Sequence, residues 1–350
     1  FFFMFHLQSI LLCFCFALCF CFVLPGSIPG QTPANEVQAL TDLYYACDGD
    51  SWKSSTNWLV GDPCKNKWFG VTCNLKSSVT FLNLPSNNLR GSIPASIGNF
   101  PELLFLTLNQ NNIGGTIPSS AGNLTSLRIL ELSSNFIQGT IPSSIGDLRS
   151  LTLMSLGQNF ITGEIPNSIQ NLSLLTFLSL FDNALTGTIP TGIGEMKNLN
   201  TLLLYHNQIS GTIPKGTGNL TDLVSLNLAS NLLSGTIPSE IGNLAKLEIC
   251  HLYKNLFSGS IPNEMGELVN LTQLELHENQ LAGTIPESLG NITNFQALFL
   301  QDNLLQSPFP KFLQTDPDIP YIYLTNNNFT CPLPSWCGKD GSSQCIPCYQ

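Results

Sequence analysis

Hydrophobic and polar positions along most of this 350-residue chain follow a pattern that recurs every 24 residues. Each recurrence reads LxxLxLxxNxLxGxIP, most plainly from Leu223 to Pro238. Its asparagine stands in register at Asn87, Asn111, Asn135, Asn159, Asn183, Asn207, Asn231, Asn255, Asn279, Asn303 and Asn327. Self-similarity at a fixed period of this length predicts a solenoid, in which every repeat buries its apolar face against its neighbours.

The LxL pair inside each repeat predicts a short strand, because its leucines alternate with other residues at a period of two. The leucines should face a common core, the residues between them should face outward, and successive strands should stack in parallel. The recurring asparagine carries two donors and one acceptor, which suits it to satisfy backbone groups where each coil turns away from the strand. We therefore interpret it as structural.

The Gly-x-Ile-Pro element followed by Ile-Gly-Asn-Leu, as at 241–244, resembles the plant-type subclass of leucine-rich repeats over residues 79–334. The preceding segment resembles the amino-terminal cap of that subclass through Trp52, Trp58, Cys64 and residues 68–73. The resemblance implies a curved right-handed superhelix with a parallel sheet on its concave face and disulfide-stapled caps. The chain is also similar to receptor-like protein ectodomains and polygalacturonase-inhibiting proteins, whose shared activity is recognition of ligands outside the cell.

The chain is expected to comprise a signal peptide at 1–30, an amino-terminal cap at 31–78, eleven repeats at 79–330 and a carboxy-terminal cap at 331–350. The first 24 residues carry no Asp, Glu, Lys or Arg, and 10–24 is an unbroken run of fifteen apolar residues. Such a run is shorter than the roughly 20 residues that cross a bilayer, so a cleaved secretory signal is favoured over an anchor. Cleavage is placed between Gly26 and Asn35.

A secreted chain is expected to oxidise its cysteines, which cluster at the two ends of the repeats. Cys64 and Cys73 should be bridged, because the short segment between them keeps them close. The four cysteines at the carboxy-terminal end permit three pairings or, as an alternative, one zinc site. The favoured pairing joins Cys331 to Cys337 and Cys345 to Cys348. Cys250 occupies an inward leucine position and is interpreted as a buried hydrophobe, whereas Cys47 has no obvious partner.

The chain carries 13 Lys and Arg against 23 Asp and Glu, a net charge of −10. It shows no basic stripe of the kind that phosphate backbones require, so nucleic acid is not expected as a partner. The sequence contains no P-loop, nucleotide-binding glycine motif, nucleophile elbow or zinc-protease helix, and its scattered carboxylates single out no glycosidase pair. We therefore expect a binding protein that has no cofactor and is not an enzyme.

The outward strand positions are informative, because nothing in the repeat dictates their identity. Two residues before the asparagine, where the first four repeats carry Pro, Asn, Ser and Gly, repeats five to nine carry an aromatic column of Phe181, Tyr205, Ala229, Tyr253 and His277. Beside it lie Leu203, His206, Asn227, His251, Lys254, Glu275 and Glu278. Exposed aromatic residues with a charged margin favour a ligand site over the alternative, cross-strand packing that stiffens the sheet. His251, Glu275 and His277 are candidates for a metal site, but scattered histidines more often make hydrogen bonds, and no metal is expected.

Six Asn-x-Ser/Thr sequons lie outside the predicted concave positions, at Asn123, Asn171, Asn219, Asn270, Asn291 and Asn328. Glycans at these asparagines would cover the outer coils and leave the concave face open, as a secreted binding protein requires.

A threonine row occupies the x position of Gly-x-Ile-Pro, at Thr116, Thr140, Thr188, Thr212, Thr236 and Thr284. Ser92 and Ser260 continue the row, and Glu164 interrupts it. Such a row resembles ice-binding proteins; the alternative is that threonine fills a short exposed strand.

Together these observations predict a secreted or cell-surface module that captures an extracellular protein, peptide or glycan on its concave face. The alternatives are the ectodomain or a fragment of a membrane receptor-like kinase, an inhibitor of a secreted glycosidase, and an ice-binding protein that uses the threonine row. A membrane is expected as a partner only if the chain is a receptor fragment or its amino-terminal segment stays uncleaved.

Overall fold

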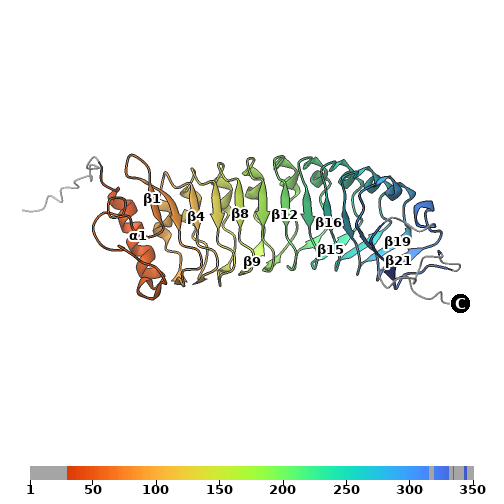
Figure 1. The fold of residues 1–350 in the computed structure, drawn as a ribbon, viewed down its shortest axis with the longest axis horizontal. Helices are drawn as coiled ribbons and strands as arrows, with labels where there is room; N and C mark the ends of the chain where they lie inside the picture. Colours follow the sequence, from red (N-terminus) through yellow and green to blue (C-terminus); the bar gives the residue numbers. More distant parts are fainter. Residues whose placement is uncertain (1–29, 315–318, 331–333, 335–342, 345–350) are drawn as a thin grey trace, which may run out of the picture.

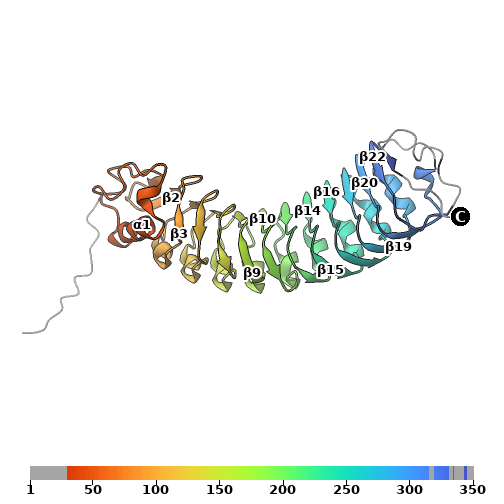
Figure 2. The same cartoon turned by 90° about the horizontal axis from the view of Figure 1, so that it is seen from below.

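A computed structural model describes residues 30–314, 319–330, 334 and 343–344. These residues form an arc of stacked coils that starts at a helical cap and follows the sequence from end to end (Figure 1). Seen from the side, the strands of the main sheet line the inner, concave face of the arc (Figure 2). The predicted signal peptide up to residue 29 and the cysteines at 331, 337, 345 and 348 lie outside the described residues.

The eleven strands predicted from the LxL pairs form one sheet, and β1 and β23 extend it to thirteen strands within the described ranges. Pairing is antiparallel between β1 and β2 and parallel from β2 to β23, with equivalent residues of successive repeats side by side, such as Leu202 beside Leu226. In order along the sheet, the strands are β1 (Val71–Cys73), β2 (Val79–Asn83), β4 (Phe105–Thr107), β6 (Ile129–Glu131), β8 (Leu153–Ser155), β10 (Phe177–Ser179), β12 (Thr201–Leu203), β14 (Ser225–Asn227), β16 (Ile249–His251), β18 (Gln273–Glu275), β20 (Ala297–Phe299), β22 (Tyr321–Tyr323) and β23 (Ser343–Gln344).

After each recurring asparagine from Asn87 to Asn303 the chain forms a second short strand, and Figure 2 shows β9, β15 and β19 on the convex side of the arc. These strands form separate parallel sheets from β3 (Arg90–Ser92), β5 (Asn112–Gly114), β7 (Gln138–Gly139), β9 (Phe160–Glu164), β11 (Ala184–Thr186), β13 (Ser210–Gly211), β15 (Leu232–Gly235), β17 (Leu256–Gly259), β19 (Gln280–Thr284) and β21 (Leu304–Gln306). Each repeat then continues through a 3-10 helix, at Ala95–Asn99, Ser119–Asn123, Ser143–Asp147, Asn167–Asn171, Thr191–Glu195, Lys215–Asn219, Ser239–Asn243, Asn263–Glu267, Glu287–Asn291 and Lys311–Leu313.

One continuous core of leucines and isoleucines runs through the stacked coils. Leu202, Leu226 and Leu274 are at most 1% exposed, which confirms the predicted register of the strands. Cys250 is fully buried in the same inward column and carries a free thiol, as its position predicts. Because each coil contacts mainly its neighbours, stability is built repeat by repeat.

The recurring asparagine forms a ladder of hydrogen bonds between coils, which confirms its structural role. The Nδ2 of Asn231 donates to the carbonyl of Leu204 at 3.0 Å and to that of Leu228 at 3.1 Å. Its Oδ1 accepts the backbone N–H of Ile209 at 3.0 Å. One side chain therefore ties a coil to the one before it, because Leu204 and Ile209 belong to the preceding repeat.

The amino-terminal cap covers the exposed end of this core with the helix α1 (Ala34–Ala46), followed by a 3-10 turn at Gly49–Ser51. Trp58 packs between Trp52 and Trp68, with ring centroids 4.9 Å and 5.1 Å away. Glu36 of α1 is fully buried and accepts the Val79 N–H at 2.7 Å, which joins the helix to β2. Burial raises the pKa of this carboxyl.

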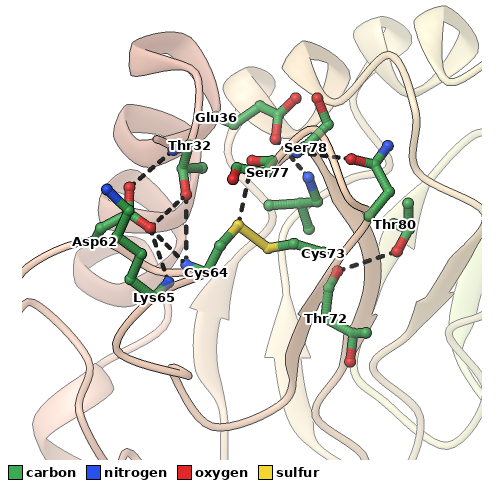
Figure 3. Close-up of a disulfide and its surroundings, with 12 residues drawn as sticks. Thr32, Glu36, Asp62, Cys64, Lys65, Thr72, Cys73, Ser77, Ser78 and Thr80 are labelled. Atoms are coloured by element: carbon green, nitrogen blue, oxygen red, sulfur yellow. Dashed lines mark hydrogen bonds between the residues drawn. A yellow bond between two sulfur atoms is a disulfide. The ribbon is translucent and has the colours of Figure 1, made fainter. Parts of the chain in front are cut away.

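A disulfide between Cys64 and Cys73 closes the cap, which confirms the predicted pairing (Figure 3). Asp62 holds the adjoining turn by accepting backbone N–H groups from Thr32 at 2.8 Å and Lys65 at 2.9 Å. Burial acts to raise the pKa of Asp62, but these hydrogen bonds outweigh it and lower that pKa. Cys47 is buried and free, and its thiol donates to the Ser92 carbonyl at 3.4 Å.

Across the described ranges, no helix combines the length and the apolar character needed to span a membrane.

Candidate ligand-binding site

The aromatic column lies along the concave sheet as two stacked pairs. Phe181 stacks on Tyr205 with ring centroids 4.6 Å apart and planes 11° apart. Tyr253 stacks on His277 at 4.4 Å and 9°. Parallel strands in register hold equivalent positions of neighbouring repeats about 4.8 Å apart, the spacing at which flat rings can stack. The four rings are half-buried, so each still presents surface to the concave side.

Ala229 separates the two pairs and is fully buried, although its strand position faces the concave side. The column is therefore interrupted by one repeat. Asn227 is the last residue of β14, and its Oδ1 accepts the backbone N–H of Ala229 at 3.1 Å. Burial raises the Tyr205 pKa, and the charge of the neighbouring Asp182 adds to this shift.

Polar groups flank the first ring pair. His206 Nδ1 lies 2.6 Å from the Asp182 carboxylate, and the His206 ring contacts Tyr205 edge-on at 5.3 Å. Both Asp182 and His206 stand directly before a ladder asparagine and have left-handed backbone, with φ of 48° and 54°. Every repeat turns at this position, so the turn presents its side chains beside the column. Leu203, also predicted beside it, is half-buried.

A second polar group surrounds the pair formed by Tyr253 and His277. His251 Nε2 lies 3.5 Å from Glu275 Oε1 and 3.2 Å from Gln273 Oε1. Lys254 Nζ lies 3.5 Å from Glu278 Oε1, on the exposed margin. Within the part of the chain that the structure describes, no cluster of three or more His, Cys, Asp or Glu side chains is arranged to hold a metal ion, and this includes the histidine–glutamate set considered from sequence.

Burial shifts the pKa values of this second group. It lowers the pKa of His277, which favours a neutral ring at neutral pH. It raises the pKa of Tyr253 and of Glu275, and the His251 charge only partly opposes the shift at Glu275. The concave face thus combines apolar ring faces with a partly desolvated carboxylate.

The sequence analysis missed the continuation of the ring surface toward the carboxy-terminal end. Phe299 packs edge-on against Tyr323 at 4.8 Å and lies 6.2 Å from His277. Both residues stand four positions before the ladder asparagine, in the column that begins with Asn83 and contains Glu275. Comparing all outward columns, rather than the one two positions before the asparagine, would have found them.

Hydroxyl groups form a separate surface on the other side of the coils. Every member of the threonine row is exposed, as are Ser92, Ser260 and Glu164. A second set of hydroxyls stands two residues before the row, within the convex-side strands, at Thr162, Thr186, Ser210, Ser234 and Ser258. Thr212, Thr236, Ser260 and Thr284 line a groove of about 670 Å³ with Pro238 and Pro262.

The glycine between these two hydroxyl positions has a geometric cause, seen at Gly235. Its φ is +74°, and an added Cβ would lie 2.9 Å from Thr212 Cγ2 of the preceding repeat. A side chain there would force strands and threonines apart.

All six sequon asparagines are exposed, and none belongs to a strand of the concave sheet. Four of them, Asn123, Asn171, Asn219 and Asn291, end 3-10 helices.

Known proteins share both the repeat and the architecture. The family model for a leucine-rich repeat region matches residues 167–347, and two further leucine-rich repeat models match 125–185 and 78–100. A probable leucine-rich repeat receptor-like protein kinase of Arabidopsis thaliana is 39% identical over 49 residues, which are 14% of this chain and 5% of that protein.

Solved structures with this fold include receptor ectodomains. The ectodomain of the Arabidopsis thaliana membrane receptor kinase GASSHO1/SCHENGEN3, in complex with CASPARIAN STRIP INTEGRITY FACTOR 2, has a TM-score of 0.75 and 35% identity over 85% of this chain and 36% of its own. The plant peptide hormone receptor RGFR1 in complex with RGF2 has a TM-score of 0.66 and 37% identity over 71% of this chain and 43% of its own. The chain thus spans less than half the length of these two receptors.

A plant ice-binding protein has a TM-score of 0.72 and 28% identity, over 87% of this chain and 97% of its own. With a leucine-rich-repeat model matched over half of its length, and with these neighbours, the chain belongs to the leucine-rich-repeat family and is of the plant type, similar to receptor ectodomains.

Proposed function

We propose that this protein is an extracellular binding module that captures a peptide or protein ligand on its concave face. The carrying observation is the pair of ring stacks, Phe181 with Tyr205 and Tyr253 with His277, set along the sheet with polar margins. Half-buried aromatic rings bury much area at small entropic cost, which is the character of binding hot spots. The repeat requires leucines, asparagine and Gly-x-Ile-Pro, but it does not require these rings.

Three further points support the proposal. Two neighbours of similar fold are receptors solved in complex with RGF2 and with CASPARIAN STRIP INTEGRITY FACTOR 2. The bridge between Cys64 and Cys73 is of the kind that persists in oxidising, extracellular surroundings. Glycans at the six sequons would leave the concave sheet open to a ligand.

The test is selection of ligands from a displayed library of random twelve-residue peptides, followed by measurement of Kd for the captured peptides. Replacing Tyr205 and Tyr253 by alanine should weaken binding by about 2 kcal/mol for each ring, which is about thirtyfold in Kd. The melting temperature should change little, because such surface substitutions usually cost within about 0.5 kcal/mol.

The matched control is a second aromatic pair off the concave face. Phe136 and Phe160 are 51% and 58% exposed, and their rings stack at 6.0 Å. Phe136→Ala with Phe160→Ala removes as many rings and should leave peptide binding unchanged. Failure of the wild-type protein to capture any peptide, or full-strength binding by the tyrosine variant, would refute the proposal.

Ice binding is the second candidate function, because a specific surface favours it. The threonine row forms an exposed, regular array outside the concave sheet, and a plant ice-binding protein of similar fold is covered over 97% of its length. Replacing Thr212 and Thr236 by glutamate should abolish any inhibition of ice recrystallisation without unfolding the coil, since Glu164 already occupies the same position. Equal inhibition by that variant and the wild type, or no inhibition by either, would dismiss this candidate.

A further inference from the structure

Glu275 carries a carboxylate on the concave face that has no close hydrogen-bond donor among the described residues. Its side chain is 17% exposed, and its carboxylate lies 3.5 Å from His251 Nε2. That nitrogen lies closer to Gln273 Oε1, at 3.2 Å. At 3.5 Å the contact with His251 is longer than a good hydrogen bond, so Glu275 has no close donor within the described ranges.

The fold does not require this carboxylate. Equivalent outward positions in the preceding repeats hold Ser179, Leu203 and Asn227, and the sheet is parallel and regular through all of them. A carboxylate removed from water without a donor costs free energy. Burial also raises the Glu275 pKa, which reflects the same cost. Retaining such a group at a place where serine or leucine would serve indicates that a donor arrives from outside the chain.

Aromatic rings stand on the strands around Glu275. In the sheet register Glu275 lies between His251 and Phe299. The stack of Tyr253 on His277 lies in the adjacent column. Cationic groups bind over such ring faces, and a guanidinium does so while its edge still donates hydrogen bonds.

Further polar atoms near these rings have no partner. Gln301 Oε1 and His277 Nδ1 are buried and make no hydrogen bond within the described ranges. Gln301 stands two residues after the end of β20, at the position that His277 holds in the preceding repeat. A guanidinium has five N–H donors in a planar fork, so two of them can donate side by side to the partly exposed Glu275 carboxylate.

The neighbouring charges do not fill this role. Lys254 lies at Glu278 on the exposed margin, at 3.5 Å. A chain with a net charge of −10 also attracts cationic ligands on encounter.

We propose that Glu275, with the rings of Tyr253, His277 and Phe299, forms a subsite for an arginine side chain of the peptide or protein ligand. This inference rests on the proposed function, since it names one residue of the ligand that the concave face would capture. The guanidinium would make ring contacts with its faces and donate to Glu275 from its edge.

The test uses the same displayed library of random twelve-residue peptides. Wild-type protein should enrich arginine at a fixed place in the captured peptides, and Glu275→Gln, which keeps the side-chain shape, should lose that enrichment. A captured peptide should bind Glu275→Gln about tenfold more weakly than wild type. Glu131→Gln is the matched control, because Glu131 is half-buried at the same strand position six repeats earlier, and it should keep both enrichment and affinity.

A substitution in the peptide completes a double-mutant cycle between the ligand arginine and Glu275. Replacing the enriched arginine by glutamine should weaken binding to wild type about tenfold and should leave binding to Glu275→Gln almost unchanged. Captured peptides that lack arginine, or equal binding by both proteins, would overturn the subsite while leaving the proposed function intact. Capture of no peptide at all would overturn both.

Discussion

Removing one rung of the asparagine ladder should cost less than its four hydrogen bonds suggest. Asn231 is 6% exposed, and its Nδ2 donates to the carbonyls of Leu204, Leu228 and Ala229. Each of these carbonyls has a second donor: Asn207 reaches Leu204, Asn255 reaches Leu228, and the His206 N–H reaches Ala229.

The Ile209 N–H is different, because Asn231 Oδ1 is its acceptor among the described residues. Asn231→Ala therefore orphans one buried donor and no carbonyl. An unpaired buried group costs about 1 to 3 kcal/mol, so the free energy of unfolding should fall by about that amount.

The shared carbonyls predict that two adjacent rungs are coupled. When Asn231 and Asn255 are both replaced by alanine, the Leu228 carbonyl loses both of its side-chain donors. The double variant should then be destabilised beyond the sum of the single variants by a further 1 to 3 kcal/mol, about the cost of one more unpaired group. Asn159 with Asn231 is the distant control, because their side chains share no carbonyl.

Urea denaturation of the single and double variants, followed by circular dichroism, measures these terms. The adjacent pair should show a coupling energy and the distant pair should not. If both pairs are additive, the carbonyls are satisfied by groups other than the ladder, and the reasoning is wrong.

Three further predictions concern stability. Thr217 is 2% exposed at a position held by isoleucine in both neighbouring repeats, and its hydroxyl has no partner in the described ranges, so Thr217→Val should raise the free energy of unfolding by about 1 to 3 kcal/mol in urea titrations. Because burial raises the Glu36 pKa above 4.5, the folded state binds that proton more tightly, and stability should fall as pH rises above 4.5; Glu36→Gln should remove this part of the pH dependence in thermal melts. Replacing Cys64 and Cys73 by serine should cost about 2 to 3 kcal/mol, because the loop they close is short, and an unchanged melting temperature would contradict this.

The parts of the fold that the sequence predicted are those set within one repeat and copied along the chain. The strand register, the buried leucines and the asparagine ladder each follow from the chemistry of a single 24-residue unit. The bridge between Cys64 and Cys73 was predictable because nine positions along the chain keep the two cysteines close. Cys47 had no such local signal. Its burial against the Ser92 carbonyl, which accompanies a thiol pKa raised to about 12, depends on how the cap meets the first coil.

The positions of the rings on the concave face could be predicted in part, because side chains follow columns along the sheet. How far neighbouring side chains bury one another could not be predicted. Ala229 was assigned to the aromatic column by position, yet the structure buries it and divides the column into two ring pairs. Phe299 and Tyr323 extend the rings through another column. Such shifts depend on side-chain size in adjacent strands, and a single repeat does not contain that information.

In a solenoid of similar coils, the side chains that contact a ligand come from equivalent positions of successive repeats and not from one continuous sequence motif. Neighbouring repeats place equivalent residues about 4.8 Å apart, so a ligand that lies along the sheet meets one residue from each column at every step. Tyr205 and Tyr253 lie two repeats apart with Ala229 between them. An extended peptide advances about 3.3 Å per residue, so its contacts with these two rings fall about three residues apart. A peptide that contacts both ring pairs therefore needs apolar side chains about three residues apart. The composition and net charge of the chain would not predict this spacing.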